Sequence, residues 1–166
     1  MLNADGDVVG IRLRTDCEFK YSIRGGRQGL FVPEGIAGIE PLLIAEGPSD
    51  TAALLDLGFA AVGRPSCNGG GSLLRKYVSR YDIKQVVIVA DRDSAGVHGA
   101  ESLLEILVPF VLSARIILPP EGVKDARAWK NGGATAADVT AAIEAATPSV
   151  CEIKLMARKR SGGYHG

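Results

Sequence analysis

The hydrophobic positions of this 166-residue chain follow one pattern up to residue 40 and another after it. In residues 8–13 and 19–23, apolar and polar side chains alternate, as they do in strands with one exposed face. A pair of glycines follows the second of these segments and marks its end. We therefore predict a small antiparallel β-hairpin within an N-terminal segment of residues 1–40.

After residue 40, unbroken apolar runs alternate with segments whose apolar residues lie three or four positions apart. Apolar runs bounded by polar turn residues are typical of strands buried in a parallel sheet, and the second spacing is typical of helices that pack on one. We predict an α/β fold over residues 41–147, with a parallel sheet of about four strands flanked by helices, and a C-terminal strand and basic tail over 148–166. The predicted strands are residues 42–46, 60–63, 86–91 and 114–119; a helix follows each, the first capped by Ser49 and the last two at 125–130 and 135–146.

Charge restricts how such a fold can bind other molecules. The formal net charge is zero, so no global field draws the protein to nucleic acid or to a membrane. A local basic face is predicted on the hairpin instead, although a solvent-exposed charged face gives the same pattern. Its residues are Arg12, Arg14, Lys20, Arg24 and Arg27.

The sequence also bears on the compartment. It contains no apolar run of the roughly 20 residues that span a bilayer, and its polar start is not a signal peptide. Its three cysteines, Cys17, Cys67 and Cys151, lie far apart, which argues against a zinc ribbon or a disulfide framework and favours a reducing compartment. We expect a cytoplasmic protein that does not bind membranes.

Acidic residues follow three of the predicted strands: Glu46, the pair Asp91 and Asp93, and Asp125. Each alone has a structural explanation, as a strand end, a loop pair or a helix N-cap. Together they meet at one edge, because the carboxyl ends of parallel strands converge there, and they would repel one another without a cation. Oxygen ligands suit Mg²⁺ or Mn²⁺, so the pattern favours metal-assisted phosphoryl chemistry, with Glu46 as a general acid or base.

Two stretches, EGPSDTAALLDLG and VVIVADRDSAG, lie about 45 residues apart and resemble the two signature motifs of the Toprim domain. That domain occurs in bacterial-type primases, type IA and type II topoisomerases, recombination mediators and small nucleases. The resemblance covers residues 41–146 and implies a Toprim (Rossmann-like) sheet. It implies that Glu46 is the general acid/base and a metal-site residue, and that Asp91 and Asp93 bind the divalent metal.

Two further stretches are similar to the catalytic core of bacterial and phage primases. The segment GDVVGIRLR…KYSIRGGRQGLF resembles the part that precedes the Toprim core, which implies that Lys20, Arg12 and Arg14 contact phosphates of template or nucleotide. The segment LPPEGVKDARAW resembles the primase stretch with a further metal-site aspartate. It implies that Asp125 is that aspartate, with Lys124 beside it on the nucleic acid or nucleotide.

The sequence departs from the primase pattern in three ways, which bear on activity rather than on fold. Many bacterial primases have a second aspartate where this chain has Arg127, and a second lysine where it has residues 32–34. A complete primase also has an upstream zinc-binding domain, which we do not find in this sequence. The chain is therefore either a fragment-sized primase relative, as in phage, plasmid or integrated elements, or a protein whose activity needs a partner supplied elsewhere, a zinc-binding domain or a helicase.

Three functions remain open at this point. The first is a primase-like enzyme of DNA replication that transfers nucleotides on a single-stranded DNA template. The second is a small Toprim nuclease, which uses water as the nucleophile; such nucleases usually begin close to the motif glutamate, unlike this chain. The third is a nucleic-acid-binding module that is inactive without partner domains. Trp129 is expected to pack among the C-terminal helices, with base stacking as the alternative.

Overall fold

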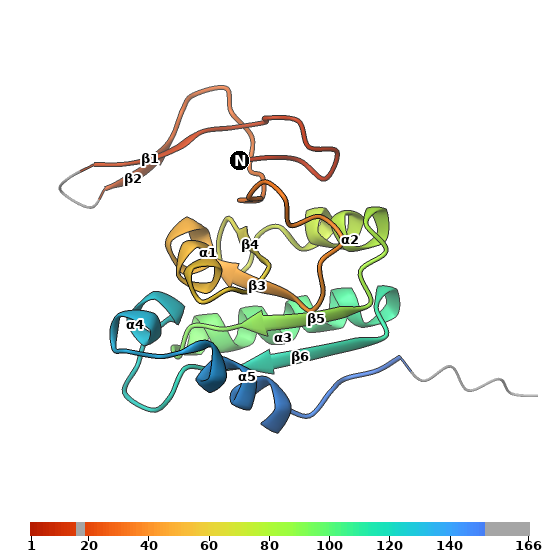
Figure 1. Cartoon of the computed structure of the whole chain (residues 1–166). Coiled ribbons are helices and arrows are strands. Elements are labelled where there is room, and N and C mark those ends of the chain that lie inside the picture. The colour runs from red at the N-terminus through yellow and green to blue at the C-terminus, as the bar shows by residue number, and fades with distance from the viewer. Residues whose placement is uncertain (16–18, 152–166) are drawn as a thin grey trace, which may run out of the picture.

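The computed structural model describes residues 1–15 and 19–151 and has a four-stranded parallel sheet at its centre (Figure 1). Hydrogen bonds join the strands in the order β4-β3-β5-β6, so that β3 and β5 are the inner strands. Both the α/β class and the parallel sheet predicted from the sequence are confirmed. The strands are β3 (Leu42–Glu46), β4 (Ala61–Arg64), β5 (Gln85–Val89) and β6 (Ser113–Ile117).

Helices cover both faces of the sheet because both faces of its strands are apolar. In β3, Leu42 and Ile44 join a core cluster with α2 and α3, whereas Leu43 and Ala45 join a second cluster with α1, α4 and α5. Within the described ranges, no helix combines the length and the apolar character needed to cross a membrane. The helices are α1 (Gly47–Asp56), α2 (Gly71–Arg80), α3 (Ser94–Leu107), α4 (Ala126–Asn131) and α5 (Ala136–Ala145), and a 3-10 turn, η1 (Val108–Phe110), follows α3.

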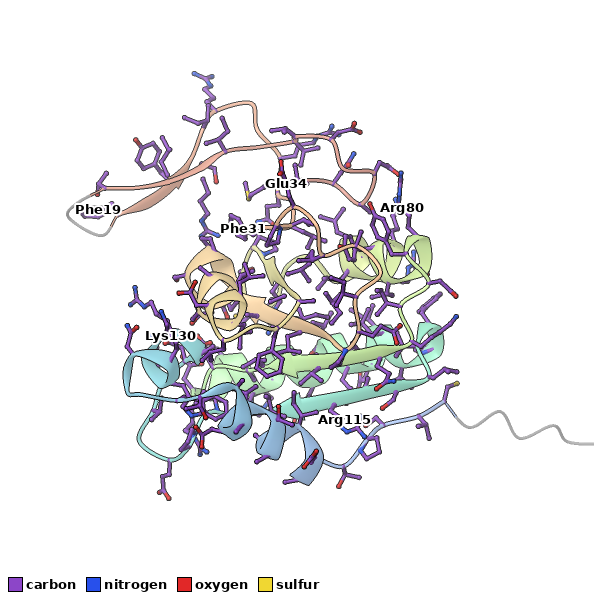
Figure 2. The ribbon with its side chains drawn as sticks, viewed as in Figure 1. Phe19, Phe31, Glu34, Arg80, Arg115 and Lys130 are labelled. Carbon is purple, nitrogen blue, oxygen red and sulfur yellow. The ribbon has the colours of Figure 1, made fainter. Side chains whose placement is uncertain are left out.

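The predicted hairpin is present and consists of β1 (Arg12–Arg14) and β2 (Lys20–Ser22). Its strands are shorter than the alternating pattern suggested, because Val8 forms a bridge with Leu2 and does not extend the hairpin. Figure 1 shows the hairpin projecting past the body of the protein, and Figure 2 shows Phe19 near its tip, where 75% of this residue is exposed.

Each outer strand of the sheet has one antiparallel neighbour. Phe31 exchanges two backbone hydrogen bonds of 2.8 and 2.9 Å with Gly63 in β4, which attaches the N-terminal segment to the sheet. Ser149 exchanges two bonds of 2.7 and 3.0 Å with Ala114 in β6. Of the predicted C-terminal strand, the structure thus contains this one bridge, and residues 152–166 lie outside the described part.

The start of the first helix differs from the sequence prediction. Ser49 was predicted as the N-cap of the first helix, but α1 begins at Gly47, with Glu46 in the N-cap position and Pro48 in the first turn. Proline favours that turn because its φ angle is already helical and its missing N–H needs no partner there. This shift brings the helix start directly against Glu46, at the end of β3.

Candidate metal and nucleic-acid site

One cavity of about 910 Å³ opens at the carboxyl ends of β3, β4 and β5. The structure brings together in it most of the residues predicted from the sequence, including Arg12 of the hairpin. The side chains of Arg14 and Lys20 lie outside the described ones, so their predicted contacts stay predictions. Five carboxylates line the cavity, Glu46, Asp50, Asp91, Asp93 and Asp125, and so do three cations, Arg12, Lys124 and Arg127.

Two of these aspartates are fixed by the helices that they cap. Asp93 accepts a hydrogen bond of 2.8 Å from the Gly96 backbone N–H at the start of α3. Asp125 accepts one of 2.7 Å from the Ala128 N–H at the start of α4. In both cases the accepting atom is Oδ1, so Oδ2 has no part in the cap. Asp125 is therefore both the N-cap that the sequence allowed and a wall of the cavity.

Arg92 joins the two loops that carry these aspartates. It lies between Asp91 and Asp93 and donates from Nε to the Pro119 carbonyl at 2.8 Å. Its backbone N–H donates to the Lys124 carbonyl at the same distance. The loop after β5 is thereby held against the loop after β6, which brings three of the five carboxylates to the same side of the cavity.

Asp50 is a member of the cluster that the sequence did not single out as a site residue. It lies in α1, is 8% exposed, and accepts a hydrogen bond of 3.0 Å from the Arg127 backbone N–H of α4. Burial is the main cause that raises its pKa above the ordinary value. The sequence feature that could have identified Asp50 is its position in the first motif, four residues after Glu46. Its burial depends on α4, which lies far along the chain.

Asp91 is the most strongly perturbed carboxylate of the cavity. Burial, followed by the charges of Glu46, Asp50, Asp125 and Asp93, raises the pKa of Asp91 to about 7. A carboxyl group in such surroundings holds either a proton or a cation near neutral pH. Burial and the neighbouring carboxylates therefore disfavour the ionised form of Asp91, which a bound cation would favour.

The donor set of the cavity fits Mg²⁺ or Mn²⁺, both of which prefer carboxylate oxygens. Within residues 1–15 and 19–151, no three His, Cys, Asp or Glu side chains converge tightly enough to form a ready-made metal cage. Mg²⁺ does not need such a cage, since it usually keeps several waters and binds one or two carboxylates together with substrate phosphates. The raised pKa of Asp91 supports the same fit, because a cation among the carboxylates would offset the charges that raise it.

The hairpin contacts the cavity directly. Arg12 donates a hydrogen bond from its guanidinium to the Pro65 carbonyl, in the loop after β4, and also lines the cavity. The cation thus shares the cavity with the acidic residues. Such an arrangement places a positive group where a phosphate could lie while its oxygens reach a metal among the carboxylates.

Gly96 sets how closely α3 approaches Asp91. A Cβ at this position would lie 2.5 Å from the Asp91 carbonyl oxygen and 2.8 Å from the Asp91 Cβ. We therefore expect Gly96→Ala to displace Asp91 and to lower the free energy of unfolding by about 1–3 kcal/mol, as overpacking does. Urea unfolding measures this loss, and titration with Mn²⁺ measures the accompanying fall in metal affinity.

Gly71→Ala is the matched control for this substitution. Gly71 is also in the first turn of a helix, but the one close contact of an added Cβ, at 2.8 Å, would be with the end of the flexible Ile106 side chain. We expect it to leave the metal affinity unchanged. Equal losses of metal affinity in both variants would contradict the role given to Gly96.

Comparison with known proteins bears on the fold. No family model matches the chain, and no curated protein matches its sequence. Solved structures do match. A DnaG primase catalytic domain bound to single-stranded DNA has a TM-score of 0.66 and 20% identity, over 89% of this chain and 50% of its own. A DNA primase domain from Pseudomonas aeruginosa has a TM-score of 0.68 and 18% identity, over 89% and 50%.

The Aquifex aeolicus primase, with its zinc-binding and RNA polymerase domains, has a TM-score of 0.67 and 20% identity, over 90% of this chain and 40% of its own. The chain thus spans half or less of the length of these primases. At such identities the likeness establishes the fold alone. The chain therefore has the Toprim-containing fold of DnaG-type primase catalytic cores.

Proposed function

We propose that the protein is a primase-like Toprim enzyme that performs metal-dependent nucleotidyl transfer on nucleic acid during DNA replication. The single observation that carries the proposal is the cavity that five carboxylates line together with Arg12 of the projecting hairpin. The primase-core fold gives the cavity a matching framework.

In this proposal Asp91, Asp93 and Glu46 hold the divalent ion, and Asp125 adds an oxygen from the next loop. A bound Mg²⁺ or Mn²⁺ would stabilise the charge on the attacking and leaving oxygens of the phosphoryl group. Glu46 accepts or donates the proton at its carboxylate, at the end of β3. Lys124 binds phosphate at the cavity wall.

Nucleic-acid contacts are assigned to the hairpin side. Arg12 orients a phosphate over the carboxylates, and Arg14 and Lys20 extend that contact along the hairpin. We infer a single-stranded DNA template and nucleotides as substrates, and a zinc-binding domain or a helicase as a partner supplied elsewhere. One matched primase binds single-stranded DNA and another includes a zinc-binding domain. The cysteine pattern supports a cytoplasmic location.

A single assay tests the proposal. The protein is incubated with a single-stranded template, nucleotides and either Mg²⁺ or Mn²⁺, and both oligonucleotide synthesis and template cleavage are followed in the same tube. We expect synthesis, and we expect Glu46→Gln to lower its rate at least about 100-fold, as removal of a general base does. Glu105→Gln, an exposed glutamate of α3, is the matched control and should keep full activity.

Other outcomes of this assay distinguish the alternatives. Cleavage without synthesis, lost in Glu46→Gln, would identify a Toprim nuclease. Metal binding without either reaction would identify a nucleic-acid-binding module that requires partner domains. Synthesis that survives in Glu46→Gln would show that the reaction does not use this cavity.

A further inference from the structure

Arg64, the last residue of β4, is a buried cation next to the acidic cavity. It is 3% exposed and does not line the cavity itself. Arginine is rarely buried to this extent unless its charge is compensated. Within the described residues, no carboxylate lies close enough to Arg64 to form an ion pair with it, so its compensation has another source.

Part of that source is the backbone. The Nη1 group of Arg64 donates hydrogen bonds to the carbonyl oxygens of Cys67 and Gly99, the latter at 2.9 Å. Cys67 belongs to the loop that lines the cavity, and Gly99 belongs to α3, which Asp93 caps. A Cβ on Gly99 would lie only 2.3 Å from the Cys67 carbonyl oxygen, so the loop rests directly on the helix.

These hydrogen bonds alone do not require a charged residue, because a neutral donor can also satisfy a carbonyl. The position of Arg64 accounts for its charge. It is the register partner of Glu46 in the β3–β4 pair, and paired residues of neighbouring strands point to the same face of a sheet. Burial lowers the pKa of Arg64, while the charges of Glu46 and Asp91 act in the opposite direction.

The charges around the cavity support this assignment. With all side chains ionised, five carboxylates and three cations leave an excess of two negative charges on its walls. Arg64 does not line the cavity but donates a hydrogen bond to Cys67, which does. Its positive charge reduces the excess from two negative charges to one, and it does not occupy the space of a metal ion or a phosphate. A fixed guanidinium is suited to this role because it stays protonated at any working pH.

We propose that Arg64 is a built-in counter-charge of the acidic cavity, which holds the carboxylates together before a divalent ion binds and limits how tightly that ion is then held. Arg64 is a positioning residue in this proposal, since it acts through Glu46 and Asp91 and touches neither metal nor substrate. The inference rests on the proposed metal site, but it does not depend on catalysis.

The test measures the affinity of the full chain for Mn²⁺ alone, without nucleic acid, by electron paramagnetic resonance of the free ion at pH 8. We expect Arg64→Met to bind Mn²⁺ about threefold to tenfold more tightly than the wild type, because a repulsive charge is removed. Arg64→Lys should stay close to the wild type. Arg75→Met, which removes an exposed cation of α2, is the control and should change nothing.

The alternative is that Arg64 acts only through its hydrogen bonds to Cys67 and Gly99. In that case every Arg64 variant would loosen the cavity and bind Mn²⁺ more weakly than the wild type. Weaker or equal binding in Arg64→Met would therefore overturn the proposal. If Arg64→Met does not fold, Arg64→Gln decides by the same criterion, because it is neutral but keeps a donor. A wild type that binds no Mn²⁺ would overturn the metal site as well. If the wild type and Arg64→Met bind Mn²⁺ equally well, only the role of Arg64 is overturned.

Discussion

Replacing Asp91 by asparagine is expected to stabilise the metal-free protein above pH 7 by about 1–2 kcal/mol, after allowance for the solvent that screens a half-buried group. The cause is the cost of an ionised carboxylate at this position. Burial and four neighbouring carboxylates raise the pKa of Asp91 to about 7, and an amide of the same shape carries no charge. The same substitution should abolish metal-dependent activity.

The stabilisation expected for Asp91→Asn depends on pH. The folded-state pKa of Asp91, about 7, lies above the ordinary aspartate pKa of 3.8, which applies to the unfolded chain. Between these values the folded protein binds the proton more tightly, so the free energy of unfolding falls as the pH rises from about 4 to about 7. Asp91→Asn should show no gain below pH 4, and its full gain only above pH 7, in urea unfolding with EDTA present.

Asp138→Asn is a control in which the stability is expected to change in the opposite direction. Hydrogen bonds from Thr135 lower the pKa of Asp138, which forms the capping box of α5. Its ionised form therefore stabilises the fold, and Asp138→Asn should lose stability above the ordinary aspartate pKa rather than gain it. A loss of stability in Asp91→Asn across the same pH range would contradict the charge imbalance assigned to the cavity.

Without metal, Asp91→Asn is expected to be more stable than the wild type above pH 7. With divalent metal bound, we expect the wild type to be the more stable of the two. Mg²⁺ or Mn²⁺ at concentrations well above its dissociation constant is expected to raise the melting temperature of the wild type, because a ligand of the folded state alone stabilises it. Asp91→Asn should respond little. Melting curves with and without metal measure both, and an equal response would place the metal away from Asp91.

Trp129→Ala is expected to lower the free energy of unfolding by about 3–5 kcal/mol, as large-to-small substitutions of buried aromatic residues do. Trp129 lies in α4, is 7% exposed, and packs in the cluster that includes Leu54 of α1 and Val87 of β5. Its loss would detach α4, which carries the hydrogen bond from Arg127 to Asp50. Chemical unfolding followed by circular dichroism measures the change.

Trp129→Phe separates packing from nucleic-acid contact. Phenylalanine fills most of the same volume, so this variant should recover most of the stability and bind single-stranded DNA as the wild type does. The burial of Trp129 supports packing over the base stacking that the sequence left open. A stable Trp129→Phe protein with greatly weakened DNA binding would contradict this interpretation.

The sheet was predictable because its signals are local. The apolar runs of β3 and β5 reach from one turn to the next and need no knowledge of their neighbours. The acidic cluster followed from topology alone, since parallel strands end at a common edge. The N-cap of α1 lies three residues before the predicted Ser49, because Pro48 favours the first helical turn and the helix begins ahead of it.

Residues that depend on distant partners were not predictable. Asp50 is buried by α4, whose Arg127 N–H lies 77 positions away. Arg64 is buried and donates a hydrogen bond to the Gly99 carbonyl, 35 positions away. The hairpin strands were predicted too long because Val8 pairs with Leu2, a contact that the alternating pattern does not encode. In each case a tertiary or bridging contact, rather than the local pattern, decides the outcome.

The two single bridges at the outer strands also bear on solubility at high concentration. An open strand edge is a template on which a second molecule can add a strand, and such addition leads to aggregation. Phe31 occupies the outer side of β4, and Ser149 occupies the outer side of β6. Both edges of the sheet are therefore obstructed by antiparallel residues of the same chain, which disfavours edge-to-edge growth of one sheet through successive copies of the protein.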